Sequence, residues 1–265
     1  GGTDFSASII ANCLNAKEVW YMKEVNGIMS ADPKMVKEAY TVSNLTYKEA
    51  AELSFFGAKI LHPMAIRPLQ EKKIPARFKN VADFDNAGTL VADIADSGPE
   101  EAKAVTCVRN VCIVSVQSCG MTKDAGIPGR VLSVIAKAGI DILIISQSGS
   151  DEKISLAIRK ENAGLLMELI HEEFELEILK NIVFCDQHPA YSAIVSVIGS
   201  GIMNIPGLSG ALLKALEDKR IGVHLMSYTS SGYNISFVVD ESKSKNAVCS
   251  LHETLMLHNK VEILQ

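Results

Sequence analysis

Short blocks of apolar and polar residues follow one another up to about residue 95, and their periodicity changes from block to block. Phe5–Leu14 has apolar residues at helical spacing, and Asn15 then favours the end of the helix. The block EVWYM, Glu18–Met22, predicts a short strand. Helical and strand-like blocks in alternation are typical of an α/β layer structure.

The clearest predicted helix start lies at Thr46. In TYKE, Thr46–Glu49, the residues have the spacing of a capping box, which predicts a helix up to Phe56, just before Gly57. The preceding segment NGIMSADPK predicts a turn, because Asn-Gly favours positive φ and Asp-Pro continues neither a helix nor a central strand. Two further strands are predicted in IPARFKN (74–80) and GTLVAD (88–93).

The second half of the chain contains a tandem repeat. Residues Ile113–Ile158 align with Ile194–Val239 without a gap, at a constant offset of 81 residues (194 minus 113). The matching pairs are Gly120/Gly201, Gly126/Gly207, Gly129/Gly210, Leu132/Leu213, Ile140/Ile221, Ser146/Ser227, Ser150/Ser231, Ile154/Ile235 and Ser155/Ser236.

Each copy is predicted to contain a strand, a glycine-rich loop, an amphipathic helix, two strands, a second helix and a short last strand. This β-α-β-β-α-β order is that of the ferredoxin-like fold, with a linker near Asp186–Ala190 between the copies. The glycines of each loop allow two interpretations. They can bring backbone N–H groups together for a small anion or carboxylate, or they can simply permit a tight strand-to-helix turn.

Composition excludes several classes of partner. The formal net charge is −5 with both signs interspersed, and no basic stripe indicates nucleic-acid binding. No apolar run is long enough to span a membrane and no secretory signal precedes the chain, so we expect a cytoplasmic protein. The six cysteines form no C-x-x-C pair and the six histidines show no ligand spacing, so we expect reduced thiols and no structural metal.

Four segments together resemble the aspartokinase family: GGTDFSAS, KEVNGIMSADPK, LTYKEAAELSFFGAKILHP and the doubled glycine-loop unit. The resemblance covers essentially the whole chain. It implies an α/β fold, in which the C-terminal portion of an amino-acid-kinase sandwich (1–97) precedes two ferredoxin-like ACT domains (103–183 and 190–265).

The resemblance implies an activity, the transfer of the γ-phosphoryl group of ATP, with Mg²⁺, to the side-chain carboxylate of L-aspartate. Such a transfer depends mainly on positioning and charge neutralisation. Gly1, Gly2 and Thr3 match the glycine-rich turn that contacts aspartate. Asp4 matches a catalytic carboxylate that orients the lysines beside the phosphates, although Thr3 or Asp4 could simply cap the following helix.

Six positions match the ATP site of the family. Lys23 and Glu24 stand where a nucleotide-contacting pair follows a tryptophan, although Met22 replaces the tryptophan and Thr-Asp is the commoner pair. Met29 and Lys34 lie in the segment at the ribose and phosphate edge. Lys59, with Ile60, matches the lysine of GAK near the phosphates, a catalytic cation. Without the flanking match, Lys59 would be interpreted as a solvated cation at a helix end.

In this family a lysine-containing phosphate loop precedes the GGTD turn, and no such loop occurs in this sequence. We therefore expect the sequence to be a fragment that does not turn over ATP by itself. Alternatively, Gly1-Gly2 is an expression scar, in which case TDFSAS still matches. Whether a homoserine dehydrogenase domain follows is left open.

The family binds lysine or threonine at paired ACT domains, often across a homodimer, as feedback regulation. Leu143 replaces an acidic residue of lysine-sensitive relatives, although Asp141 lies two residues earlier on the same predicted strand face. Gln147 resembles threonine-responsive forms. Both effectors therefore stay open, as does a non-enzymatic amino-acid-binding module. The effector-binding candidates are Met121, Ala125, Gly126, Ile127, Asp141, Gln147 and Ser148.

Overall fold

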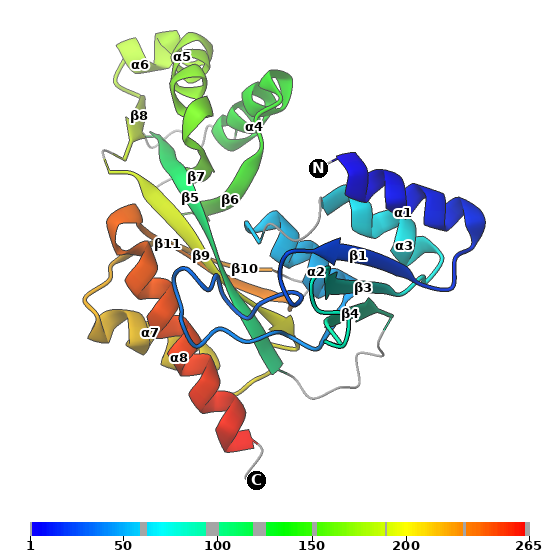
Figure 1. Cartoon of the computed structure of the whole chain (residues 1–265). Helices are drawn as coiled ribbons and strands as arrows, with labels where there is room; N and C mark the ends of the chain where they lie inside the picture. The colour runs from blue at the N-terminus through cyan, green and yellow to red at the C-terminus, as the bar shows by residue number, and fades with distance from the viewer. Residues whose placement is uncertain are drawn as a thin grey trace.

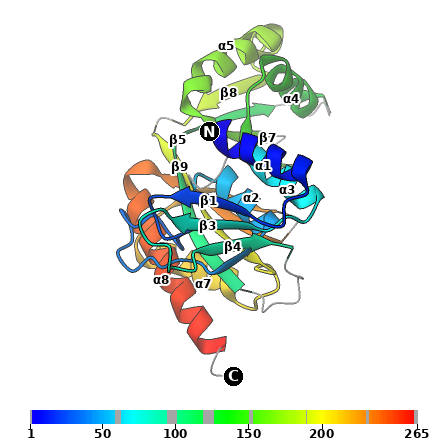
Figure 2. The ribbon, with the colours of Figure 1, turned by 45° about the vertical axis from the view of Figure 1, so that its right-hand side comes forward.

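The computed structural model describes residues 2–58, 63–93, 101–118, 126–149, 153–188, 190–229 and 232–262. We call residues 2–93 the N-terminal part, and the two sequence repeats the first and second units. Figure 1 shows the first unit (green) at one end of the long strand β5 and the second unit (yellow to red) at the other. The N-terminal part (blue to cyan) lies alongside β5, as the turned view in Figure 2 also shows.

The N-terminal part is a four-stranded sheet with helices α1 and α3 packed together beside it. The sheet order is β1-β3-β4-β2, in which β3 is parallel to β1 and antiparallel to β4. Its elements are α1 Gly2–Leu14, β1 Val19–Lys23, β2 Asn44–Thr46, α2 Tyr47–Phe55, η1 Pro63–Ala65, α3 Ile66–Glu71, β3 Ala76–Asn80 and β4 Thr89–Ala92.

The capping box is confirmed. Thr46 Oγ1 accepts from the Glu49 N–H at 3.1 Å, and Glu49 Oε2 accepts from the Thr46 N–H at 2.7 Å. Helix α2 ends one residue earlier than predicted, at Phe55, with Phe56 as its C-cap. The sequence analysis missed β2 and α3. Strand β2 is too short to show a period, and Pro68 lies in the first turn of α3, where a proline is tolerated.

The two units repeat the same succession of elements, as their sequences predict. The first unit contains β5 Glu101–Ser118, α4 Ile127–Ala138, β6 Ile142–Ser148, β7 Lys153–Arg159, η2 Lys160–Asn162, α5 Ala163–Glu173, α6 Glu175–Leu179 and β8 Val183–Gln187. The second contains β9 Ser192–Ser200, α7 Leu208–Asp218, β10 Val223–Tyr228, β11 Asn234–Asp240, η3 Glu241–Lys243 and α8 Ser244–Glu262.

Strand β5 serves both units. Its second half pairs with β7 and β8, which gives the first unit the order β8-β5-β7-β6. Its first half pairs with β9, which gives the second unit the order β5-β9-β11-β10. The sequence predicts a short last strand for the second unit. This prediction is wrong for the described residues, because helix α8 continues to Glu262. The place beside β9 is taken by the first half of β5. The division at 103–183 and 190–265 stays a prediction.

Three apolar cores hold these parts together. The helix face of the first unit forms its own core around α4 and α5. The core around α7 and α8 of the second unit also takes in Ala31 and Val36 of the N-terminal part. A third core joins the N-terminal part to the opposite faces of both sheets, through residues such as Leu53, Ile113 and Ile198. Among the described residues, no helix is both long and apolar enough to cross a membrane.

Candidate functional site

Asp4 and Lys23 form an ion pair where α1 begins and β1 ends. Lys23 Nζ lies 3.0 and 2.9 Å from the two carboxylate oxygens of Asp4. The side chains of Lys23 and Asp4 are 32% and 20% exposed, so solvent can still reach the pair. Asp4 also lies in the first turn of α1, where the helix dipole stabilises a carboxylate. The structure thus brings together two residues that the sequence predicts for one site.

The predicted glycine-rich turn is wrong for Gly2 and Thr3, because both lie in the first turn of α1. The expectation that Thr3 or Asp4 caps this helix from outside is wrong for the same reason. Ser6 Oγ donates to the Gly2 carbonyl at 2.9 Å, a bond between residues one helical turn apart. The first N–H groups of a helix have no partner within it, so this end of α1 still offers donors to an anion. Gly1 lies outside the described residues.

A buried contact fixes α1 against β1 behind the ion pair. The hydroxyl of Tyr21 and the Oγ of Ser8 lie 2.6 Å apart, and Tyr21 stacks on Phe78 of β3 with 5.0 Å between ring centroids. Burial raises the pKa of Tyr21 above its ordinary value. This contact sets the distance between the start of α1 and the end of β1.

The loop after β1 carries the remaining described candidates for nucleotide binding. Glu24 and Lys34 are exposed, and Met29 is half-buried. Met29 forms an isolated bridge with Thr41, whose Oγ1 lies 3.6 Å from the Met29 sulfur. The Lys34 N–H donates to Asp32 Oδ1 at 2.9 Å, which closes the predicted Asp-Pro turn.

Ser30 attaches this loop to the second unit. Its carbonyl accepts from the Val105 N–H of β5 at 2.7 Å. Its hydroxyl lies 2.9 Å from Nε2 of His252 in α8 and accepts from the Tyr40 N–H at 3.1 Å. Ser30 and His252 are both buried, and burial lowers the pKa of His252 below its ordinary value of 6.5. The segment predicted to contact the nucleotide is therefore held by β5 and by helix α8 of the second unit.

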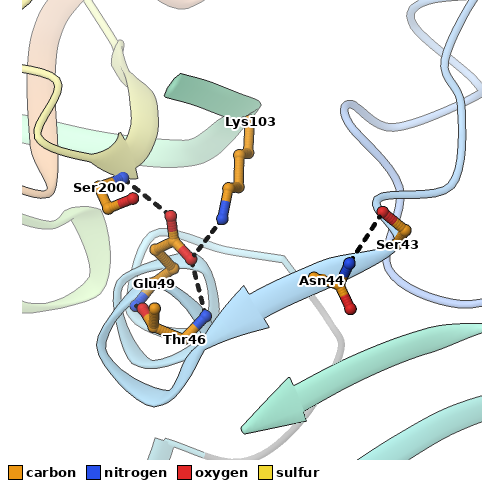
Figure 3. Close-up of polar contacts among 6 residues, drawn as sticks. All are labelled: Ser43, Asn44, Thr46, Glu49, Lys103 and Ser200. Atoms are coloured by element: carbon orange, nitrogen blue, oxygen red, sulfur yellow. Dashed lines mark hydrogen bonds and ion pairs between the residues drawn. The ribbon is translucent and has the colours of Figure 1, made fainter. Parts of the chain in front are cut away.

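Glu49 forms a second attachment, shown in Figure 3. Its side chain is fully buried. Besides the Thr46 N–H, its carboxylate accepts from Lys103 Nζ of β5 at 3.0 Å and from the Ser200 N–H of β9 at 2.8 Å. A buried carboxylate is tolerated when it is paired and hydrogen-bonded in this way. The sequence analysis identified Glu49 only as a capping residue, because neither Lys103 nor Ser200 is near it in sequence.

The segment after α2 packs closely on β5. Gly57 has φ of +97°, and a Cβ built there would lie 2.9 Å from the carbonyl oxygen of Cys107. Only glycine fits such an approach without strain. Lys59 and Ile60 follow immediately, but they lie outside the described residues.

The effector candidates of the first unit fall into two groups. Gly126 precedes α4, and the side chain of Ile127 is buried in the core of the unit, which leaves its backbone for a ligand. Ser148 and Gln147 lie at the end of β6, where Ser148 pairs with Lys153 and Lys153 pairs with Gln117 of β5. The end of β6 therefore lies at the same sheet edge as the loop that leaves β5.

Asp141 lies elsewhere. It is exposed and precedes β6, so the prediction that it shares a strand face with Leu143 is wrong. A register shift between Ile142 and Ile144 also interrupts the alternation there. Six residues of extended chain, about 20 Å, separate Asp141 from Gln147 within one chain. Met121 and Ala125 lie outside the described residues.

Comparison with known proteins now adds to this geometry. Residues 1–80 match the family model described as Amino acid kinase family, and residues 114–174 and 195–255 each match ACT domain. A bifunctional aspartokinase/homoserine dehydrogenase of Haemophilus influenzae is 32% identical over 98% of this chain and 32% of that protein. Aspartokinase 1, chloroplastic, of Arabidopsis thaliana is also 32% identical, over 96% of this chain and 44% of that protein. The resemblance to aspartokinases is confirmed.

A solved structure agrees with these relatives. Escherichia coli aspartokinase III in complex with aspartate and ADP matches with a TM-score of 0.81 and 26% identity. That match covers 97% of this chain and 56% of the E. coli chain. This chain thus spans about a third of the bifunctional relative and just over half of the solved kinase. Within the described residues, no group of three or more His, Cys, Asp or Glu side chains is arranged to hold a metal ion.

Proposed function

We propose that this chain is part of an aspartate kinase that transfers the γ-phosphoryl group of ATP to the side-chain carboxylate of L-aspartate. The observation that carries the proposal is the Asp4–Lys23 pair at the N-terminal end of α1. A lysine held by a carboxylate beside unpaired helix N–H groups can receive a phosphate or a substrate carboxylate. The E. coli relative was solved with aspartate and ADP, which supports the same ligand classes here.

In this proposal, Asp4 orients Lys23 and the loop carrying Glu24, Met29 and Lys34 borders the nucleotide. Lys59 adds a cation near the phosphates, with Ile60 beside it, and Gly1, Gly2 and Thr3 contact aspartate. Mg²⁺ enters with ATP and neutralises phosphate charge. We expect the chain by itself to turn over no ATP, because the lysine-containing phosphate loop of the family does not occur in this sequence. The reaction belongs to cytoplasmic amino-acid biosynthesis.

The two repeat units are proposed to regulate this activity by binding L-lysine or L-threonine, as a homodimer. In this proposal, Gly126 and the backbone of Ile127 at the start of α4, with Gln147 and Ser148 at the end of β6, form one half of such a site. Met121 and Ala125 belong to the same loop. Because Asp141 lies at the other end of β6, it can contribute only from a second copy.

Calorimetric titration of the chain with each amino acid tests this function. We expect one of them to bind in the micromolar to millimolar range, and Gln147→Ala to weaken that binding more than Gln187→Ala, a matched change in β8. In parallel, the chain is incubated with L-aspartate and Mg-ATP, and ADP is measured. Binding without ADP release agrees with a fragment but also with a non-enzymatic module. Repeating the ADP assay on a chain with a complete kinase domain separates these two. If neither amino acid binds to the folded chain, the regulatory role is contradicted.

A further inference from the structure

The glycine-rich loops of the two units occupy equivalent positions in the sequence repeat, and the loop of the second unit lies within the described residues. At the 81-residue offset, Ser200 corresponds to Cys119, and the loop 201–207 corresponds to 120–126. In the second unit, the backbone N–H at the start of this loop is already bonded. Ser200 donates it to Glu49 Oε1 at 2.8 Å, and Glu49 belongs to α2 of the N-terminal part.

The second loop is also closed by its own apolar side chains. Ile202 is fully buried and Ile205 is 8% exposed, and both pack in the core formed by α7 and α8. The corresponding residues of the first unit are Met121 and Asp124. An aspartate does not anchor a loop in an apolar core, so the two loop sequences favour different environments.

A cation faces the Glu49 carboxylate at a position peculiar to the second unit. Lys103 lies at a register shift of β5, between Ala102, which pairs with Gly199, and Ala104, which pairs with Ile198. The first unit has β8 in the place of this half of β5, and its pairing from Val183 to Gln187 is continuous. A bulge adds a residue and redirects its side chain. Lys103 therefore has no counterpart in β8, the strand that takes this place in the first unit.

A neighbouring contact ties the same two parts together. Glu52 Oε2 accepts from Asn234 Nδ2 of β11 at 3.1 Å, and Asn234 Oδ1 accepts from Ser236 Oγ at 2.7 Å. The first-unit residue equivalent to Asn234 is Lys153. Successive turns of α2 thus both place carboxylates against the second unit.

We propose that Glu49 is a built-in carboxylate ligand of the second unit. It takes the N–H at the start of the glycine-rich loop and the ammonium of Lys103, the donors that a free amino-acid carboxylate would use. The second unit therefore docks α2 at the place where the carboxylate of a free amino acid would bind. The part concerning amino-acid binding rests on the proposed regulatory function.

Amide NMR of the ¹⁵N-labelled chain tests the division between the units. On titration with L-lysine or L-threonine, we expect saturable shifts in the amides of 119–127 and 147–149 and none in those of 200–208. If the amides of Ser200 and Gly201 also shift saturably, with the same half-saturation concentration as those of the first loop, the proposal is overturned. An absence of shifts in both loops contradicts the regulatory function and leaves the occupancy of the second loop to the next experiment.

Chemical rescue tests the carboxylate directly. Glu49→Ala removes the carboxylate, and we expect the thermal midpoint of unfolding to fall. Added acetate should restore at least half of this loss when chloride is used to hold the ionic strength constant. The double variant Glu49→Ala/Lys103→Met should lose this rescue. Glu18→Ala is the matched control, because Glu18 is ion-paired with Arg77 at the surface. Acetate should not change its midpoint.

The outcomes distinguish a ligand from a merely structural residue. A folded Glu49→Ala chain that responds to acetate no more than to chloride overturns the proposal. Where Glu49→Ala does not fold, Glu49→Gln replaces it, since glutamine keeps the capping box. Loss of the charge should then lower the thermal midpoint and shift the Ser200 amide resonance. An unchanged midpoint and an unchanged resonance would equally overturn it.

Discussion

The first and second units have the same order of elements but different neighbours. Among the residues that the structure describes, the core of the first unit consists only of its own residues, whereas the equivalent core of the second includes Ala31 and Val36 of the N-terminal part. His171 of the first unit is exposed, and its equivalent His252 is buried against Ser30. The comparison shows that a duplicated fold can keep its architecture while one copy becomes a support for another domain.

The largest effect is expected from matched core truncations. Leu216 and Ile135 are equivalent residues with 1% and 2% exposure, so Leu216→Ala and Ile135→Ala should each cost about 3 kcal/mol in urea unfolding. Only Leu216→Ala should speed hydrogen exchange in residues 28–42, because Leu216 shares a core with Val36. Equal acceleration in both variants would contradict the difference between the units.

Gly57→Ala is expected to cost about 2 kcal/mol, because alanine is strained at a φ of +97° and its Cβ meets the Cys107 carbonyl. Gly129→Ala and Gly210→Ala are matched controls in equivalent turns of α4 and α7, with no atom within 4 Å of the added Cβ. Both should change stability by less than about 1 kcal/mol, in the stabilising direction. Thermal unfolding measures all three variants. An unchanged stability of Gly57→Ala would contradict the close approach of Gly57 to the Cys107 carbonyl.

Buried His252, which holds Ser30, should make the stability of the chain depend on pH. Because burial lowers the pKa of His252 below 6.5, the unfolded chain takes up a proton first as pH falls. The contribution of neutral His252 is therefore complete above pH 6.5 and is lost as pH falls toward the folded pKa, by up to about 1.4 kcal/mol per pH unit. Glu38 and Glu253 oppose this shift. In urea unfolding between pH 7 and 5, His252→Gln should flatten the dependence of stability on pH.

The smallest effect is expected at the half-exposed pair. Asp4→Asn should cost about 0.5 kcal/mol of stability, because solvent screens the Asp4–Lys23 pair. Glu49 is fully buried, so its replacement should cost much more. Thermal unfolding at low and high salt compares the two pairs. A loss of stability above about 2 kcal/mol for Asp4→Asn would show that solvent exposure does not decide how much each of the two ion pairs contributes.

Local patterns predicted much of the fold. The capping box at Thr46 and Glu49 needs only residues of one helical turn, and the 81-residue repeat needs only self-similarity. Both predictions are confirmed. The missed features depend on distant partners. Strand β2 gains its pairing from β4, and the two halves of β5 pair with different strands although they form one continuous strand, Glu101–Ser118.

The candidate site divides in the same way. The resemblance identified Asp4 and Lys23, and the structure joined them; it also separated Asp141 from Gln147 by the length of β6. The sequence by itself determined the repeat, the helix starts and the chemistry available. Only the tertiary structure decided that Glu49 serves β9 and that His252 holds Ser30. The physical reason is that a backbone N–H or a buried ring acts on whichever group packing brings within about 3 Å.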